Sequence, residues 1–305
     1  VPGAYLQGDQ HETEQMLLRA PVGFREYDER GDEIYWLLQH PLYGQSDAGA
    51  IWNRTINHFN TTPLPDGLGL ERCSHDPGLY SKVVNEAGDR CTKVLYVDDM
   101  KYYYDCGAKG VADGDLAKTT DKFGVEFSQE DPETDYFLGA DRRRFGKHAA
   151  KTYAATYIGL QAKRYLPDGH EPCERYPAFW SYTPADETLI KAHAEAVAHK
   201  RPAPVELEQR YGALQGALQH AVKYRPEISA AMDLLGCCLT LPTAALLACA
   251  VRVLVYLGRT RQLGVTYSKH APNARRLYAR ADANWRATRS TTGYCIFLGG
   301  AAIAT

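Results

Sequence analysis

The stretch KVLYVDDM, residues 93–100, decides the fold of the first part of the chain. A short apolar run from Lys93 to Val97 is followed by a second β-like run from Met100 to Tyr104, and only Asp98 and Asp99 lie between them. Two such runs joined by two turn-forming residues are typical of a tight antiparallel hairpin. The sequence therefore predicts a hairpin with two carboxylates at its tip.

Adjacent carboxylates indicate a metal site. Like charges repel, so one of the two takes up a proton unless a cation lies between them. Two-metal nucleotidyl transfer uses carboxylates that hold Mg²⁺ ions roughly 3.5–4 Å apart. Asp is also a common turn residue, and the pair alone is more often a polar turn. The apolar strand that leads into the pair is a rarer pattern, and it favours the metal site.

Outward from the hairpin, the pattern predicts an α+β fold. The first 145 residues mix β-like runs with helices, the middle of the chain is mostly helical, and the last part is an antiparallel meander around Gly turns. Helices are expected at 48–59, 111–123, 211–219, 226–239 and 243–257, linkers at 167–184 and 201–204, and meander strands at 277–285, 292–298 and 301–305. We divide the chain accordingly into 1–145, 146–275 and 276–305.

The composition excludes several classes of protein. With 45% hydrophobic and 24% charged residues, the chain is globular and not disordered. The stretch Leu234–Val251 contains no charged residue, but Pro242 interrupts it, so two buried helices are expected there and no membrane span. The eight cysteines show no C-x-x-C pair and no Cys/His metal spacing, which favours a reducing compartment and no structural zinc.

Basic residues are concentrated in one segment, although the net charge is −2. Between residues 251 and 290 there are nine Lys or Arg and a single acid, Asp282. Such a basic arm suits a phosphate backbone, or it is a solvated surface stretch. The nine residues are Arg252, Arg259, Arg261, Lys269, Arg275, Arg276, Arg280, Arg286 and Arg289.

The motifs along the chain resemble, in one order, those of the Pol polyprotein of copia-type retrotransposons. YVDD at 96–99 resembles the catalytic box of their reverse transcriptases. The other matching segments are VPGAYLQG (1–8), APVGF (20–24), LYGQSDAGAIW (42–52), DPGLY (76–80), YFLG (136–139), RPEI (225–228), RVLVYLGRT (252–260), DANW (282–285), STTGY (290–294) and FLG (297–299). The resemblance implies a partial polymerase palm and fingers in 1–145, a helical thumb and connection in 146–275, and the first strands of a truncated ribonuclease H sheet in 276–305.

The resemblance also implies roles for individual residues. Asp98 and Asp99 correspond to catalytic ligands of Mg²⁺ or Mn²⁺, and Asp282 corresponds to the first metal-binding carboxylate of ribonuclease H. Residues 42–52 would begin the helix that packs against the incoming nucleotide and the template. The residues that correspond to substrate-binding positions are Tyr5, Gly44, Asp47 and Tyr96, and those that correspond to the primer grip are Phe137, Leu138 and Gly139. Tyr5 matches a steric gate that excludes the ribose 2′-hydroxyl; its alternative role is an aromatic residue of the palm core.

The sequence departs from the family pattern at several points. The first catalytic Asp of the family stands directly before the residue matched by Val1, and the upstream finger strands precede it. Asp47 occupies a position where the family usually has Gln, and Asn284 replaces the second Asp of its motif. We therefore expect this fragment to be inactive alone as a polymerase. It also ends before the remaining ribonuclease H carboxylates, so we expect no ribonuclease H activity.

Three functions follow. The first is RNA-directed DNA polymerase, with an RNA or DNA template and primer, dNTPs and other polyprotein segments as partners, no membrane, and a location in cytoplasmic virus-like particles or the nucleus. The second is a non-catalytic remnant that binds nucleic acid weakly and in a salt-dependent manner. The third, a viral RNA-dependent RNA polymerase, shares the paired Asp but usually carries Gly before it.

Overall fold

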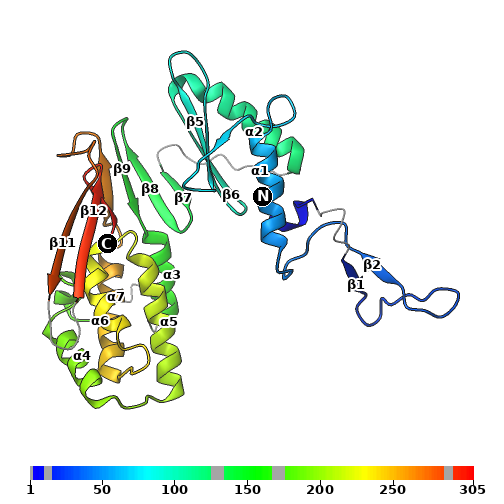
Figure 1. The fold of residues 1–305 in the computed structure, drawn as a ribbon. Helices are drawn as coiled ribbons and strands as arrows, with labels where there is room; N and C mark the ends of the chain where they lie inside the picture. Colours follow the sequence, from blue (N-terminus) through cyan, green and yellow to red (C-terminus); the bar gives the residue numbers. More distant parts are fainter. Residues whose placement is uncertain (1–2, 10–15, 125–133, 167–175, 285–290) are drawn as a thin grey trace. The chain divides into compact units, whose positions relative to one another are not determined.

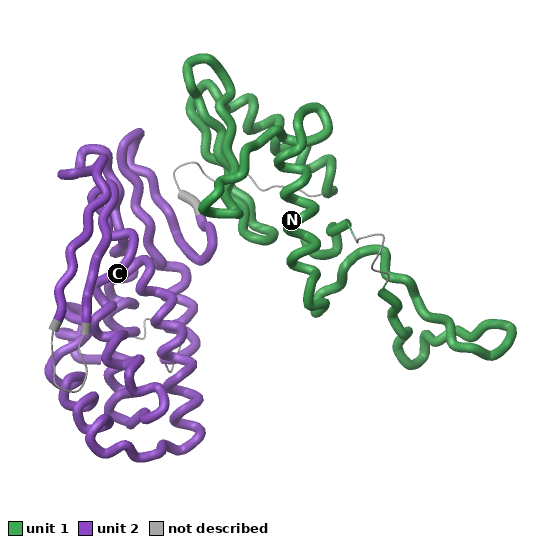
Figure 2. The backbone as a smooth tube through the Cα atoms, in the orientation of Figure 1, with its two compact units in different colours: residues 1–129 green, residues 130–305 purple. Residues whose placement is uncertain are grey.

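The computed structural model describes residues 3–9, 16–124, 134–166, 176–284 and 291–305. The chain divides into two compact units, unit 1 (Val1–Gln129) and unit 2 (Glu130–Thr305), and each is described by itself (Figure 2). The boundary lies before the strands at 134–153, whereas the sequence-based division lay at 145/146. These strands join unit 2 because they pair with a strand at 264–268.

Unit 1 is built around an antiparallel sheet of order β3-β4-β5-β6 (Figure 1). Its core combines residues of both helices and the sheet, among them Trp52, Phe59, Tyr80, Leu95 and Phe123. The elements are η1 (Ala4–Gln7), β1 (Leu17–Arg19), β2 (Tyr35–Leu37), α1 (Ala48–Thr61), β3 (Glu71–Arg72), β4 (Leu79–Val83), β5 (Arg90–Tyr96), β6 (Asp99–Tyr104), η2 (Cys106–Ala108) and α2 (Lys109–Phe123).

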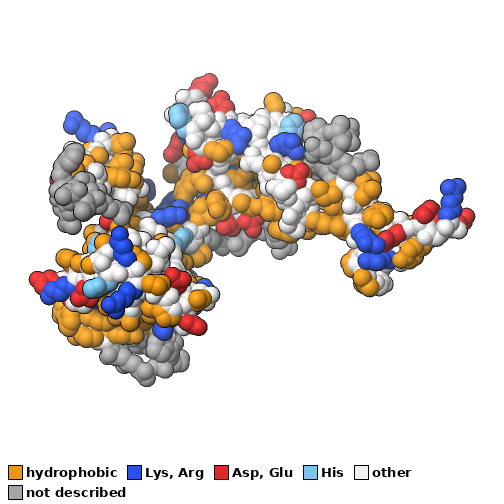
Figure 3. All heavy atoms as spheres, turned by 60° about the horizontal axis from the view of Figure 1, so that its bottom comes forward, with side chains coloured by type: hydrophobic (Ala, Val, Ile, Leu, Met, Phe, Trp, Pro, Cys, Tyr) orange, Lys and Arg blue, Asp and Glu red, His pale blue; other side chains and the backbone are white. Residues whose placement is uncertain are grey.

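Strands β1 and β2 form a separate antiparallel arm. Its large side chains remain exposed, including Leu17, Phe24 and Trp36, and Figure 3 shows hydrophobic and charged side chains side by side on this arm. No described part of unit 1 covers these side chains, so the arm contributes little to the hydrophobic core.

Unit 2 combines a helical bundle with two antiparallel sheets, of order β10-β9-β8-β7 and β11-β12-β13. Helix α7 is almost wholly buried along its second half, and helices α3, α4, α5 and α6 pack with it in one core. The elements are β7 (Thr134–Phe137), β8 (Ala140–Phe145), β9 (Ala149–Tyr153), α3 (Ala155–Tyr165), η3 (Ala178–Ser181), α4 (Glu187–His199), α5 (Val205–Ala221), η4 (Pro226–Ile228), α6 (Ser229–Gly236), α7 (Ala244–Arg259), β10 (Gly264–Ser268), β11 (Tyr278–Asn284), β12 (Thr291–Leu298) and β13 (Ala301–Ala304).

The α+β class is confirmed at this level: the described residues form seven α-helices and several antiparallel sheets. All five predicted helices and the C-terminal meander are present. Thr243 caps α7 by accepting a hydrogen bond from the Leu246 amide at 3.2 Å, directly after Pro242. Among the described residues, no helix is long and apolar enough to cross a membrane.

Two motifs far apart in the sequence meet through Arg225. This side chain is 1% exposed. Its guanidinium donates to the backbone oxygen of Thr260 at 3.0 Å, to the Thr260 hydroxyl at 2.6 Å and to Glu227 Oε1 at 2.6 Å. It also lies over the ring of Tyr256, 5.3 Å from the centroid. Arg225 therefore connects the segment after α5 to the end of α7.

Replacing Arg225 with Lys should lower the free energy of unfolding of unit 2 by about 2–3 kcal/mol. Lys keeps the charge but not the planar group that reaches Thr260 and Glu227 together, so at least one of these part-buried hydrogen bonds is lost. Chemical unfolding followed by circular dichroism measures the loss. Arg210→Lys, at an exposed position on α5, is the control. A loss below about 0.5 kcal/mol, no larger than for a surface change, would contradict this role.

The basic arm expected between residues 251 and 290 is only partly available to a ligand. Arg252 is 6% exposed and pairs with Asp186, which caps helix α4, and its guanidinium lies over the ring of Trp180. Arg259 donates to the backbone oxygens of Tyr176 and Pro177 at 2.7 and 2.6 Å. Backbone carbonyls bind Arg259 and a carboxylate binds Arg252, so these two side chains offer less to a phosphate than the sequence alone suggests. Arg286 and Arg289 lie outside the described residues.

Candidate active site at the Asp98–Asp99 hairpin

Strands β5 and β6 form the predicted hairpin, but its turn lies one residue earlier than expected. Tyr96 pairs with Asp99, so the two turn residues are Val97 and Asp98, and Asp99 is the first residue of β6. Tyr96 is 60% exposed, and the side chains of Asp98 and Asp99 are also exposed. The two carboxylates therefore stand on consecutive residues at an open hairpin tip, where a ligand can reach them.

Val97 has an unusual backbone. Its φ is 54°, at the first central position of a two-residue turn, which hairpins usually give to Gly. A β-branched residue is rare in this left-handed region, and the conformation costs about 1–2 kcal/mol. It persists only where the surroundings impose it.

Trp52 supplies such a constraint. Its indole Nε1 donates to the backbone oxygen of Val97 at 2.8 Å. The indole is 2% exposed, and it packs edge-on against Phe123 with centroids 5.4 Å apart. Helix α1 thereby holds the turn that presents the carboxylates. The sequence motif at 42–52 includes this Trp, but nothing in the sequence indicates that it bonds to the hairpin.

Replacing Trp52 with Phe should reduce the stability of unit 1 by about 1–2 kcal/mol, because the Val97 oxygen loses its donor while most of the ring volume remains. Chemical unfolding followed by circular dichroism measures this. The matched change Trp36→Phe, on the exposed β1–β2 arm, should alter stability by less than about 0.5 kcal/mol. Equal effects of the two changes would show that the indole hydrogen bond does not stabilise the turn.

Three of the four residues expected to contact the nucleotide, Tyr5, Gly44 and Asp47, lie near the start of α1, and the fourth, Tyr96, ends β5. Tyr5 is half-buried, and its ring lies 5.3 Å from that of Tyr43. A side chain at Gly49 would come within 3.8 Å of the Tyr5 hydroxyl. Asp47 precedes α1, and its backbone oxygen accepts from the Ile51 amide at 2.9 Å, while its side chain makes no capping hydrogen bond.

The position of Gly44 is set by its backbone. Its φ is 97°, which strongly favours Gly, and the space where a side chain would lie is open.

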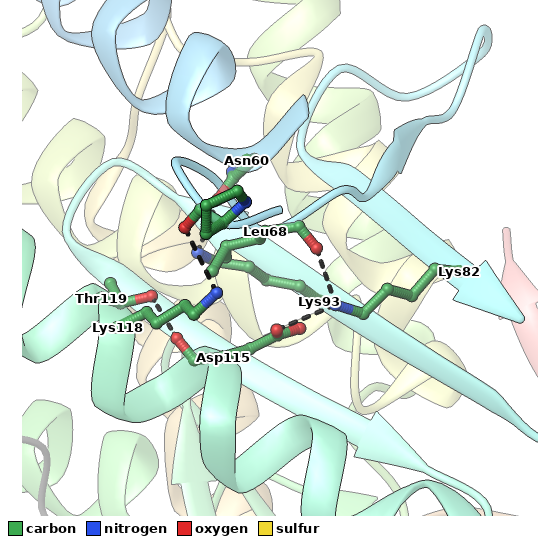
Figure 4. Close-up of polar contacts among 8 residues, drawn as sticks. Asn60, Leu68, Lys82, Lys93, Asp115, Lys118 and Thr119 are labelled. Atoms are coloured by element: carbon green, nitrogen blue, oxygen red, sulfur yellow. Dashed lines mark hydrogen bonds and ion pairs between the residues drawn. The ribbon is translucent and has the colours of Figure 1, made fainter. Parts of the chain in front are cut away.

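A buried polar cluster lies within unit 1, and it includes Lys93 of strand β5 (Figure 4). Lys93 is fully buried, and its Nζ donates to Asn60 Oδ1 at 2.8 Å. Lys82 Nζ donates to Asp115 Oδ1 at 2.8 Å and to the backbone oxygen of Leu68 at 2.7 Å. Burial lowers the pKa of Lys93 to about 7, and the Asp115 charge opposes this only in part.

Lys93 is buried because of the alternation along β5. Cys91, Lys93 and Leu95 all point to the inner face, as residues two apart on a strand must. The sequence pattern treated 93–97 as an apolar strand and did not foresee a buried amine there.

The expected primer grip and ribonuclease H residues belong to unit 2. Leu138 and Gly139 are the two turn residues between β7 and β8, with φ values of 53° and 82°. The Leu138 oxygen accepts from the Tyr224 hydroxyl at 3.2 Å, and a side chain at Gly139 would approach His220 Nε2 at 3.0 Å. The turn therefore packs closely against the end of α5. Phe137 is the last residue of β7 and is 9% exposed.

Asp282 lies on β11, where it is exposed. Its Oδ1 accepts from the Ala283 amide at 2.9 Å. It lines a cavity of about 820 Å³ together with Asp233 of α6 and Tyr294 of β12. Asn284 is at the end of the same strand.

The carboxylate pair fits Mg²⁺ in part. Asp98 and Asp99 offer the oxygen ligands that this ion prefers. Among the described residues, however, no three His, Cys, Asp or Glu side chains form a group that could hold a metal ion.

Comparisons with known proteins give similarity over nearly the whole chain. It is 27% identical to the "Retrovirus-related Pol polyprotein from transposon RE1" of Arabidopsis thaliana, over 98% of this chain. It is 28% identical, over the same share, to the corresponding polyprotein from transposon RE2 of that plant. The chain spans 18% of the length of each of these relatives. No protein-family profile matches it. No solved structure matches it either.

Proposed function

We propose that this chain, a relative of copia-like retrotransposon Pol polyproteins, is the reverse transcriptase segment of such a polyprotein. The similarity over 98% of its length supports the kinship with retrotransposon polyproteins. The observation that carries the polymerase assignment is the pair of exposed carboxylates at the tip of the β5–β6 hairpin, with the backbone of its turn hydrogen-bonded to Trp52.

In this proposal Asp98 and Asp99 bind Mg²⁺ or Mn²⁺. The metal, when bound, would stabilise negative charge as the primer 3′-hydroxyl loses its proton and attacks the α-phosphorus of a dNTP, from which pyrophosphate leaves. Tyr5, Gly44, Asp47 and Tyr96 contact the nucleotide, with the Tyr5 ring as the steric gate. Phe137, Leu138 and Gly139 contact the primer, and Asp282 begins the ribonuclease H site. The partners are a template with its primer, dNTPs and other polyprotein segments, in cytoplasmic particles or in the nucleus.

The palm with part of the fingers corresponds to 1–145, the thumb and connection to 146–275, and the start of ribonuclease H to 276–305. The antiparallel meander β11-β12-β13 supports the last assignment, because it matches the order of strands expected there.

A non-catalytic remnant is the second candidate. One observation favours it: Asp47, directly before α1, puts a negative charge where the family usually has Gln and where an anionic substrate would lie. The family pattern places a further catalytic Asp directly before the residue matched by Val1, and a polymerase site needs that carboxylate to complete the metal ligands. The two candidates therefore differ in whether a longer segment of the polyprotein is active.

Primer extension tests the proposal. The chain, and the chain preceded by an upstream polyprotein segment that ends in Asp, are incubated with an RNA template, a DNA primer, dNTPs and Mg²⁺ or Mn²⁺. We expect the longer segment to extend the primer and to require the metal. If the longer segment is folded by circular dichroism and binds the template and primer but extends nothing with either metal, the remnant is the correct assignment.

A further inference from the structure

A basic cavity of about 640 Å³ lies in unit 2. Four Lys or Arg side chains and one His line it, and none of its lining residues is acidic. The five are Arg144, Lys147, His148, Lys269 and Arg275. Three of them come from the β8–β9 hairpin, and two come from the loop that follows β10, more than a hundred residues later in the sequence.

Backbone hydrogen bonds fix these segments to one another. Strands β9 and β10 pair over their full length. Beyond the paired residues, the Lys269 amide donates to the His148 oxygen at 3.0 Å. The Ser268 amide donates to the Gly299 oxygen at 2.8 Å, and the Gly299 amide donates to the Ala274 oxygen at 3.2 Å. The rings of His148 and His270 also meet, with centroids 5.3 Å apart. The backbone segments that carry the cationic side chains are therefore held together by hydrogen bonds within the protein.

Among the described residues, no acidic side chain lines this cavity. Within the described residues, none of the four Lys and Arg side chains forms a salt bridge, in contrast to Arg252, which is paired with Asp186. Like charges gathered in a concave site repel one another and raise the local potential, which attracts anions. The basic arm seen in the sequence thus contributes only Lys269 and Arg275 here, and the fold adds Arg144 and Lys147.

We propose that this cavity binds consecutive phosphates of a polynucleotide backbone. Its volume lies within the usual range for ligand pockets, roughly 300–1,000 Å³, and it has more cations than a single phosphate requires. Cations that contact phosphates position a nucleic acid without reading its sequence. That the anion is a polynucleotide rests on the proposed function, but the site belongs to unit 2 and does not use the Asp98–Asp99 hairpin.

Binding of a labelled RNA–DNA duplex to the full chain, followed by fluorescence anisotropy at several salt concentrations, tests this. The test variant is Arg144→Ala, Lys147→Ala and Arg275→Ala together. The control is Lys163→Ala, Arg201→Ala and Arg210→Ala, three exposed positions of unit 2 outside the cavity with the same change in charge. Circular dichroism and a thermal melt establish that both variants are folded.

We expect the test variant to bind at least about tenfold more weakly at low salt. The slope of log affinity against log salt should fall by about 1 for each phosphate that the variant no longer neutralises. The control should stay within about twofold of the unaltered chain. Equal weakening by both variants would overturn the proposal, because net charge alone would then explain binding. Displacement of the duplex by inorganic phosphate at equal phosphate concentration would also overturn it, in favour of a small-anion site.

These outcomes are separable from the polymerase assignment. The cavity lies in unit 2 and its lining includes neither Asp98 nor Asp99, so duplex binding by the cavity variant is measured without the polymerase reaction. A longer segment that binds through the cavity but does not extend a primer would refute the proposed function and retain the binding site.

Discussion

Replacing the buried Lys93 with Met should remove most of the pH dependence of the stability of unit 1 between pH 7 and about pH 9. Burial lowers the pKa of Lys93 to about 7, whereas an unfolded chain gives a Lys pKa of about 10.4. Between these values the folded chain holds a neutral amine and the unfolded chain a charged one. Unfolding therefore takes up a proton.

It follows that stability rises with pH in this window. The linkage relation gives a slope of up to about 1.4 kcal/mol per pH unit, or roughly 2 kcal/mol between pH 7 and 9, because Lys93 is still partly protonated near pH 7. Below its folded pKa, the amine is charged in both states and the dependence ends. The cost of holding this amine neutral at pH 7 is about 4 kcal/mol by the same relation.

The ionisable groups around Lys93 contribute differently to the pH dependence of stability. The nearby Asp115 carboxylate and the Lys82 amine pair with each other, and burial raises the pKa of the Cys91 thiol. A thiol whose pKa is raised on folding lowers stability as pH rises through the unfolded value, so Cys91 opposes Lys93 near pH 9. Comparing the slope of the unfolding free energy against pH between variants separates the contribution of Lys93 from that of Cys91.

Urea unfolding at several pH values measures those slopes. Replacing Trp180 and Trp285 with Phe leaves Trp36 and Trp52 of unit 1 as the fluorescent reporters. Lys93→Met should reduce the increase of the unfolding free energy with pH. The variant also leaves Asn60 without its hydrogen-bond donor, but the cost of that loss does not depend on pH. Lys122→Met, at an exposed position of α2, should leave the rise intact. An unchanged slope in Lys93→Met would show that the amine is charged in the folded chain.

Local patterns in the sequence were sufficient to predict many of the helices and strands. The hairpin, α1 and the C-terminal meander were predicted because each is formed by neighbouring residues. The pairing of β9 with β10 was not predicted, since its strands lie more than a hundred residues apart and neither is distinctly apolar. The division of the chain into units depends on that pairing.

The sequence named the residues of the candidate site but not the contacts that hold them in place. YVDD identified Asp98 and Asp99, yet the turn lies at Val97 and Asp98 because Tyr96 pairs with Asp99. The contacts of Trp52 with Val97 and of Arg225 with Thr260 are tertiary hydrogen bonds, which no local pattern encodes. The residues of both contacts nevertheless lie within the motifs that resemble the family. That resemblance was the signal in the sequence that could have pointed to them.

Asp98→Asn and Asp99→Asn should each lower the rate of primer extension by about 10²–10³-fold or more in a segment long enough to be active. Asn has nearly the same shape but lacks the negative charge that binds a divalent cation, and loss of a group that stabilises charge in the transition state costs this much. Both side chains are exposed, so the effect on folding should be small.

Single-nucleotide incorporation by the longer segment, with an RNA template and increasing Mg²⁺, is the most direct test of the claim that this hairpin is the polymerase metal site. The matched control is Asp121→Asn, which makes the same change at an exposed position of α2 in unit 1. We expect normal incorporation by the control and almost none by Asp98→Asn or Asp99→Asn. Near-normal rates in both hairpin variants, at the same Mg²⁺ concentration, would contradict the claim.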